Sequence, residues 1–149
     1  MAPASATDTT LASDLLAVVA RINRLANQRV RLSLPFAQAR LLSTIEAEGR
    51  ARISDLAALD HCSQPTMTTQ VRRLEDAGLV SRTVDPDDAR AVLISITPDG
   101  VATLAQVRAD RGNAIDPYLD QLDSADRDTL ASAVQIMRGL LAETSPHRN

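Results

Sequence analysis

Residues 63–100 have the sequence SQPTMTTQVRRLEDAGLVSRTVDPDDARAVLISITPDG, in which several secondary-structure signals follow one another. Ser63 is a good N-cap, and Pro65 suits a first helical turn because its missing N–H would have no partner there. Gly78 can adopt the left-handed conformation that ends a helix. Between them, apolar residues recur at helical spacing, at Met67, Val71 and Leu74. These signals predict a helix from Ser63 to Gly78.

A β-hairpin is predicted directly after this helix. Two runs with strand-like composition, 79–84 and 91–96, flank the turn-forming segment 85–90. Thr97 and Pro98 then supply the N-cap and first residue of another helix. Helix, strand, hairpin, strand and helix is the element order of a winged helix-turn-helix. We therefore expect a mainly α fold with a small β-wing.

The face of the 63–78 helix opposite its apolar stripe carries hydroxyl, amide and guanidinium groups. Such groups hydrogen-bond base edges and phosphates in a major groove. The alternative is a solvated helix face without a partner. The candidates for DNA contact on this face are Gln64, Pro65, Thr66, Thr68, Thr69, Arg72 and Arg73.

Two residues of the hairpin complete the DNA-binding candidates. Arg90 is placed at the exit of the predicted turn, and Asp88 precedes it by two residues. An arginine at a wing tip can enter a minor groove, where the narrow width concentrates negative potential. A nearby carboxylate can hold its guanidinium group in place. Alternatively, the acidic residues only form the turn and Arg90 is a surface charge.

At this point the sequence resembles the MarR (multiple antibiotic resistance regulator) family. The wing is similar to the family's D-x-R…L-T-x-x-G signature at Asp88-Ala89-Arg90, Leu93, Ile94, Ile96-Thr97 and Gly100. Segments 64–68 and 73–82 resemble its recognition helix and the entry to its wing, and a weaker resemblance covers residues 10–142. Many members have Arg where this chain has Thr69, so a base contact common in the family is expected to be absent or weaker here.

The resemblance implies a function. It implies a homodimeric transcription regulator, a repressor, that binds a pseudo-palindromic site in double-stranded DNA. It also implies that a small phenolic or other anionic effector releases the DNA. From this sequence alone, no residues of an effector site can be named, and no cofactor is expected.

Both flanks of the winged region carry apolar stripes with heptad-like spacing. A helix from Thr10 to Arg31 repeats apolar residues at intervals of 4, 3 and 4, and a helix capped by Ser124 repeats them likewise. Ordinary packing within one chain is one explanation, and the resemblance favours contacts between subunits. The candidate dimerisation residues are Leu11, Leu15, Val18, Ile22, Leu130, Val134, Met137 and Leu141.

These elements predict a single domain over residues 1–149. Residues 34–97 form its DNA-binding part, and residues 8–31 and 98–142 form the dimerisation helices. The remaining expected elements are a helix from Leu34-Pro35 to Glu48, an extended segment 51–53 that pairs with the wing, a helix 55–59 capped by Ser54, a turn 60–62, a helix from Pro98 towards Ile115 broken near Asp116-Pro117, and disordered ends at 1–8 and 143–149.

Composition excludes several classes of protein. Phe36 and Tyr118 are the only aromatic residues, which argues against single-stranded nucleic-acid binding by base stacking. The net charge is −3, and all 16 basic residues are arginine. The start has no signal-peptide pattern, and no apolar run approaches the ~20 residues of a membrane span. We therefore expect a cytoplasmic protein without membrane contact.

Cys62 and His61, in the predicted turn, admit three interpretations. A nucleophile with its base is disfavoured because adjacent turn residues point apart and no third orienting group is evident. A cysteine-based redox sensor is a second interpretation, and a small packing residue is a third. The ligand clusters of zinc sites are missing, so no metal site is expected. An interaction module on a winged-helix scaffold remains the alternative to DNA binding.

Overall fold

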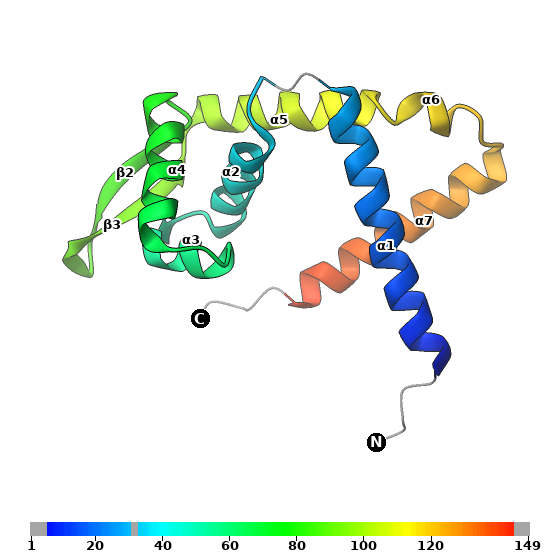
Figure 1. Cartoon of the computed structure of the whole chain (residues 1–149), viewed down its shortest axis with the longest axis horizontal. Coiled ribbons are helices and arrows are strands. Elements are labelled where there is room, and N and C mark those ends of the chain that lie inside the picture. Colours follow the sequence, from blue (N-terminus) through cyan, green and yellow to red (C-terminus); the bar gives the residue numbers. More distant parts are fainter. Residues whose placement is uncertain (1–5, 31–32, 145–149) are drawn as a thin grey trace.

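The computed structural model describes residues 6–30 and 33–144 of the 149-residue chain. A compact lobe contains the three strands, the helices between residues 36 and 76 and the first part of the helix that follows the wing, and two long terminal helices lie beyond it (Figure 1). This architecture confirms the predicted fold class. The elements are α1 (Ala6–Arg29), α2 (Phe36–Glu48), β1 (Ala51–Arg52), α3 (Ile53–Leu59), α4 (Gln64–Asp76), β2 (Val80–Asp85), β3 (Asp88–Ile96), α5 (Pro98–Asn113), α6 (Asp116–Leu119) and α7 (Ser124–Thr144).

The three strands form an antiparallel sheet in the order β1-β3-β2. Ala51 pairs with Ile94, which confirms that the segment after α2 pairs with the wing. Asp85 pairs with Asp88 across a loop of two residues, so β3 begins earlier than the predicted 91–96 strand. The wing is therefore longer than the sequence predicted, because pairing continues up to this tight loop.

The hairpin is irregular near its tip. The register shifts from Val84↔Val92 to Asp85↔Asp88, so residues 89–91 of β3 bulge opposite one step of β2. We call residues 89–91 the wing bulge. Such bulges re-aim side chains and strengthen local twist. Arg90 thus lies in a bulged strand, and the expectation that it marks the exit of a six-residue turn was wrong.

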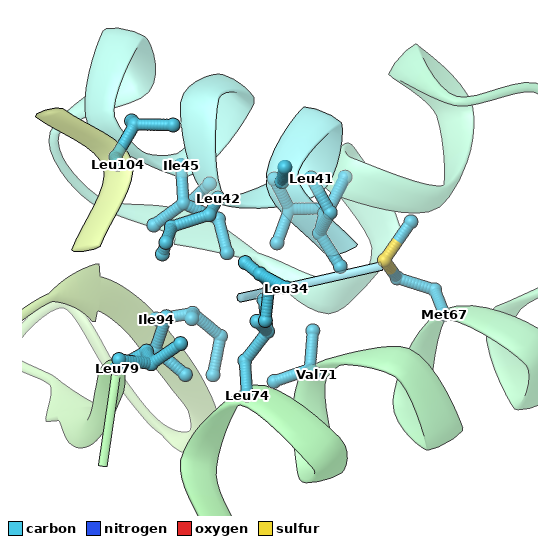
Figure 2. Close-up of a cluster of buried hydrophobic side chains, with 14 of the residues drawn as sticks. Leu34, Leu41, Leu42, Ile45, Met67, Val71, Leu74, Leu79, Ile94 and Leu104 are labelled. Atoms are coloured by element: carbon cyan, nitrogen blue, oxygen red, sulfur yellow. The ribbon is translucent and has the colours of Figure 1, made fainter. Parts of the chain in front are cut away.

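The hydrophobic core fills the space between α2, α3, α4, the sheet and α5 as far as Val107 (Figure 2). The predicted stripe of α4 is confirmed, because Met67, Val71 and Leu74 are all fully buried. Leu104 and Val107 close the core from α5. Other buried members of this cluster are Leu34, Leu41, Leu42, Ile45, Leu56, Leu79 and Ile94.

Two predicted caps fix the ends of the helices around the wing. The Ser63 hydroxyl accepts a hydrogen bond from the Thr66 N–H at 3.3 Å. The Thr97 hydroxyl accepts the Gly100 N–H at 3.0 Å and donates to the Gly78 carbonyl at 2.7 Å. Gly78 has φ +73°, as expected for a residue that ends a helix. Thr97 therefore joins the end of α4 to the start of α5.

Two other predicted caps were wrong by one or two residues. Helix α3 begins at Ile53, and its N-cap is Arg52, which is extended because it still pairs with β3. Ser54 therefore lies inside the helix. Helix α7 begins at Ser124 itself, and the carboxylate of Asp123 accepts the Asp126 N–H at 2.8 Å. Asp123 performs the capping assigned to Ser124.

The ends of the long helices also differ from expectation. Residues 6–8 and 143–144 are helical, although both segments were expected to be disordered. Adding a turn to an existing helix costs much less than nucleating one, which accounts for both extensions. The rest of the expected disordered ends and the expected helix end at Arg31 lie outside the described residues. The predicted break near Asp116-Pro117 is confirmed, since α5 ends at Asn113 and α6 starts at Asp116.

The apolar stripes of α1 and α7 lie largely in solvent within one chain. Leu11 and Leu141 are each 69% exposed, and Val18 is 53% exposed. Leu15, Ile22, Leu130 and Val134 are 40–47% exposed, and Met137 is intermediate. The intrachain core therefore does not cover these stripes.

Candidate nucleic-acid interface

Helix α4 has one buried face and one exposed face. Its apolar stripe faces the core, so the residues between the stripe positions point outwards. The structure places all seven candidates of this helix on the exposed side: Gln64, Pro65, Thr66, Thr68, Thr69, Arg72 and Arg73. Helix α4 itself lies beside the wing in Figure 1.

The threonines of this face use their hydroxyl protons within the helix. Thr68 donates to the Gln64 carbonyl at 2.8 Å, and Thr69 donates to the Pro65 carbonyl at 3.1 Å. Each hydroxyl oxygen therefore keeps its lone pairs for an outside donor. An acceptor beside a methyl group suits the amino groups of cytosine or adenine and the methyl group of thymine.

An ion pair sets the wing against α4. Arg82 in β2 contacts Glu75 in the last turn of α4, with 2.6 Å between Nε and Oε2. Both side chains are about one third exposed, so the pair is partly shielded from solvent. A contact between these two elements restricts how the wing turns relative to the exposed face of α4.

Arg90 is exposed, and its main chain is held by Asp88. The Asp88 carboxylate accepts the Arg90 main-chain N–H at 3.0 Å. The expectation that Asp88 holds the Arg90 guanidinium is not met, because a short aspartate side chain at a turn bonds most easily to the backbone two residues on. In the part of the chain that the structure describes, no ion pair includes Arg90.

Sequence reasoning missed Arg52, which contacts the base of the wing tip. Its Nε and Nη2 lie 3.0 and 2.5 Å from one carboxylate oxygen of Asp85, and its Nη1 lies 4.0 Å from Asp88. The other Asp85 oxygen accepts the Asp87 N–H at 2.9 Å. Asp85 is only 6% exposed. We call Arg52, Asp85 and Asp88 the wing clamp.

The wing clamp perturbs two ionisation equilibria. The hydrogen bond from the Asp87 N–H and then that from Arg52 lower the pKa of Asp85, because both favour the charged carboxylate. The hydrogen bond to Asp85 raises the pKa of Arg52. Both groups are therefore charged at neutral pH. The only sequence signal for this contact was the predicted pairing of segment 51–53 with the wing.

Cys62 is partly buried and packs against the hydrophobic core. This placement supports the packing interpretation, and redox sensing by Cys62 stays a hypothesis. His61 is exposed, with φ +51° in the turn before α4. Within residues 6–30 and 33–144, no group of three or more His, Cys, Asp or Glu side chains is arranged to hold a metal ion.

A second concave site lies between α1, α2 and α5. It is a cavity of about 270 Å³ lined by Asn23, Phe36, Ala39, Arg40, Ser43, Leu104, Val107, Arg108 and Arg111. The sequence did not predict it, because its lining comes from three separate helices. It joins an aromatic ring, apolar side chains and three guanidinium groups.

The arginines of this cavity differ in how their groups are paired. Arg40 contacts Asp60 at 2.6 Å and Arg108 contacts Glu46 at 2.7 Å. Arg111 donates to the Asn23 side chain at 2.7 Å, but its Nε is buried and has no hydrogen-bond partner. Its guanidinium carbon lies 5.7 Å from the centroid of the Phe36 ring. A buried donor without a partner is the group that a bound acceptor would satisfy.

Among the helices that the structure describes, none is both long and apolar enough to cross a lipid bilayer.

Comparison with known proteins identifies the chain's relatives. Residues 34–92 match the sequence profile of the MarR family. A helix-turn-helix-type transcriptional regulator of Mycobacterium tuberculosis is 33% identical over 138 residues, which cover 92% of this chain and 96% of the relative. Transcriptional regulator Tm0710 of Thermotoga maritima has a similar structure, with TM-score 0.74 and 24% identity over 94% of this chain and 99% of its own.

A further solved structure is that of a mutant of MarR from E. coli in complex with operator DNA. It superposes with TM-score 0.58 and 23% identity, over 86% of this chain and 93% of that one. The profile match and the full-length relative confirm the resemblance seen in the wing and the helix before it. The chain belongs to the MarR family of helix-turn-helix transcriptional regulators.

Proposed function

We propose that the protein is a repressor that binds a pseudo-palindromic operator in double-stranded DNA as a homodimer. The observation that carries this proposal is the exposed face of α4, with hydroxyl, amide and guanidinium groups beside the projecting wing. Helix α4 enters the major groove, and Arg90 enters the adjoining minor groove. Access to genomic DNA requires a cytoplasmic location.

The exposed stripes of α1 and α7 supply the dimer contacts. Residues such as Val18 and Val134 repeat along one side of each helix and stay 53% and 40% exposed within the chain. A two-fold dimer buries the same surface twice and presents two copies of α4. The half-site centres then lie about one helical turn, ~10 bp, apart.

Local charge, rather than total charge, supports DNA binding. The chain has a net charge of −3, so its overall field does not attract nucleic acid. Arg72, Arg73 and Arg90 are nevertheless exposed on the elements that would face the duplex. Affinity should therefore depend strongly on a few arginines and on salt concentration.

Fluorescence anisotropy tests this proposal. Wild type and the variants Arg73→Ala and Arg90→Ala are titrated onto duplex DNA from upstream of the protein's own gene and onto a scrambled duplex, over a range of salt. If the replaced arginine contacts a base, the variant should lose about 1–3 kcal/mol of DNA-binding free energy. If the arginine contacts a phosphate, the variant should bind all sequences less tightly. Arg24→Ala is the control, because Arg24 is exposed on the face of α1 opposite its apolar stripe, and α1 lies away from α4 and the wing.

Two results separate DNA binding from the alternative of a protein-interaction module. Tight, selective binding that Arg90→Ala abolishes supports the regulator and its wing contact. The opposite result is weak binding that is equal on both duplexes and unchanged in both variants. If a random-sequence selection then also yields no binding site, the assigned DNA interface is refuted.

We further propose that a small phenolic anion binds the cavity between α1, α2 and α5 and releases the DNA. The unpartnered Nε of Arg111 and the nearby Phe36 ring offer a donor and an aromatic surface. The cavity is lined by α1 as well as by helices of the lobe. A ligand that fits only one placement of α1 relative to the lobe would therefore shift the equilibrium towards that conformation.

Salicylate and its neutral analogue salicylamide test this effector site. Salicylate should weaken DNA binding by wild type, salicylamide should not, and Arg111→Met should remove the response while it keeps binding in the absence of ligand. An equal effect of both compounds, or an unchanged response in Arg111→Met, rules out the proposed anion site.

A further inference from the structure

The wing clamp lies directly beside the residue assigned to the minor groove. Arg52 contacts Asp85 through two nitrogens, and Asp85 ends β2. The third guanidinium nitrogen of Arg52 lies 4.0 Å from Asp88, which begins β3. One guanidinium group therefore bonds to the end of β2 and lies within ion-pair distance of the start of β3, on either side of the two-residue loop at the wing tip.

The clamp also determines the backbone on either side of the loop. Asp85 accepts the Asp87 N–H, which shapes the loop, and Asp88 accepts the Arg90 N–H, which shapes the wing bulge. Regular pairing with β2 stops at Val92, so the bulge lacks a continuous ladder to hold it. The carboxylates hold the bulge in the place of that ladder.

We propose that Arg52 is a positioning residue for DNA binding, which acts through Asp85 and Asp88 to hold the wing bulge and so aims Arg90 at the minor groove. This inference rests on the proposed function, because it requires Arg90 to contact DNA. Its geometric basis is the near-complete burial of the Asp85 carboxylate against a guanidinium from a different strand.

A direct phosphate contact by Arg52 is the competing explanation. Arg52 is 41% exposed, so its charge also adds to the field at the interface. The two explanations predict opposite signs for Asp85→Asn. Removal of a negative charge near DNA tightens binding if only the field matters, whereas loss of the clamp weakens it.

The experiment measures operator affinity by anisotropy for Arg52→Ala, Arg52→Lys, Asp85→Asn, Arg90→Ala and the double variant Arg52→Ala/Arg90→Ala. We expect Arg52→Ala to weaken binding by about 5- to 50-fold in wild type and by less than about twofold when Arg90 is already Ala. Arg52→Lys should also weaken binding, because an ammonium group cannot replace the planar fork. Asp85→Asn should weaken binding by several fold.

Folding is checked separately so that lost binding can be interpreted. Thermal melts by circular dichroism establish that each variant keeps the lobe. Amide hydrogen exchange should then speed up in residues 87–92 of Arg52→Ala and stay unchanged in α4. Arg24→Ala removes one exposed guanidinium from the face of α1 opposite its apolar stripe, and it should bind like wild type.

The outcomes distinguish the two proposals. If Arg90→Ala weakens binding but Arg52→Ala adds an independent loss, or Asp85→Asn tightens binding, the positioning role is overturned and the wing contact stands. If Arg90→Ala leaves binding unchanged, the wing contact in the proposed function fails, and the positioning role fails with it.

Discussion

The lobe and the two long terminal helices use apolar residues at the same helical spacing, with opposite results. In the lobe, the stripe of α4 is completely buried against α3, α2 and the sheet. In α1 and α7, stripes with similar spacing stay largely exposed. Heptad-like spacing therefore predicts that a helix has a partner, but it does not tell whether that partner is in the same chain.

This difference separates two kinds of stability. The lobe closes its core with elements of one chain, so its folding should depend little on protein concentration. The apolar stripes of the terminal helices are partly exposed within one chain, so in the proposed dimer the stability of these helices should depend on protein concentration. The following predictions test this division, from the largest expected effect to the smallest.

Val18→Asp should separate the dimer. Two-fold symmetry repeats the substitution, so two carboxylates would be buried without partners, and the dimer dissociation constant should rise more than about a hundredfold. Analytical ultracentrifugation measures the change. Ser13→Asp adds the same charge to the opposite face of α1 and should leave the dimer intact. A dimeric Val18→Asp variant would show that the stripe is not the interface.

Leu42→Ala should destabilise the lobe by about 2–5 kcal/mol, because Leu42 is fully buried and its truncation leaves a cavity. Urea denaturation at several protein concentrations measures the loss. Leu59→Ala removes the same atoms from a lobe residue that is 52% exposed, and it should cost much less. Equal losses in the two variants would mean that the core is not closed as described.

Gly100→Ala should destabilise the lobe by about 1–3 kcal/mol through overpacking. A Cβ at this position would overlap the Leu79 carbonyl oxygen and the Ile96 side chain. Gly112→Ala lies in the same helix, where a Cβ meets nothing within 4 Å, and it should instead stabilise by about 0.5–1 kcal/mol. Thermal melts compare the two variants. If both substitutions changed the stability in the same direction, the close approach of α5 to the residue before β2 would be contradicted.

The stability of the wing should depend on pH through Asp85. Its pKa is lowered in the folded state, so the stabilisation is fully present above the unfolded value of about 3.9 and is lost as pH falls through the folded value. The difference in unfolding free energy between wild type and Asp85→Asn should be constant near neutral pH and should shrink below about pH 4. A difference that does not change with pH would exclude a titrating Asp85.

Local chemistry explains which parts of the fold the sequence could predict. The caps at Ser63 and Thr97 use side chains within three residues of the groups they bind, so the pattern contains all the partners. The caps at Ser54 and Ser124 were misplaced because strand pairing and the aspartate before α7 decide where those helices begin. Such competition depends on tertiary contacts.

The candidate site divides in the same way. The exposed face of α4 follows from its buried stripe, so its seven candidates could be assigned from spacing alone. Arg52 could not be assigned, because it contacts a residue 33 positions away. The role of Asp88 was misjudged because its backbone partner depends on the two-residue loop. The cavity lined by Phe36 and Arg111 required three helices to be placed together.

Helix α5 connects the lobe to α6 and α7, so a change in its tilt would move the lobe relative to the terminal helices. Leu104 and Val107 fix it in the lobe, and its far end leads through α6 to α7. Sixteen residues span about 24 Å, so a tilt of about 5° at the far end displaces the lobe by roughly 2 Å. In a dimer, two such helices would move the two copies of α4 relative to successive major grooves. If the proposed effector rearranges the cavity, the length of α5 would convert that small change into a mismatch between the two copies of α4 and the spacing of the DNA.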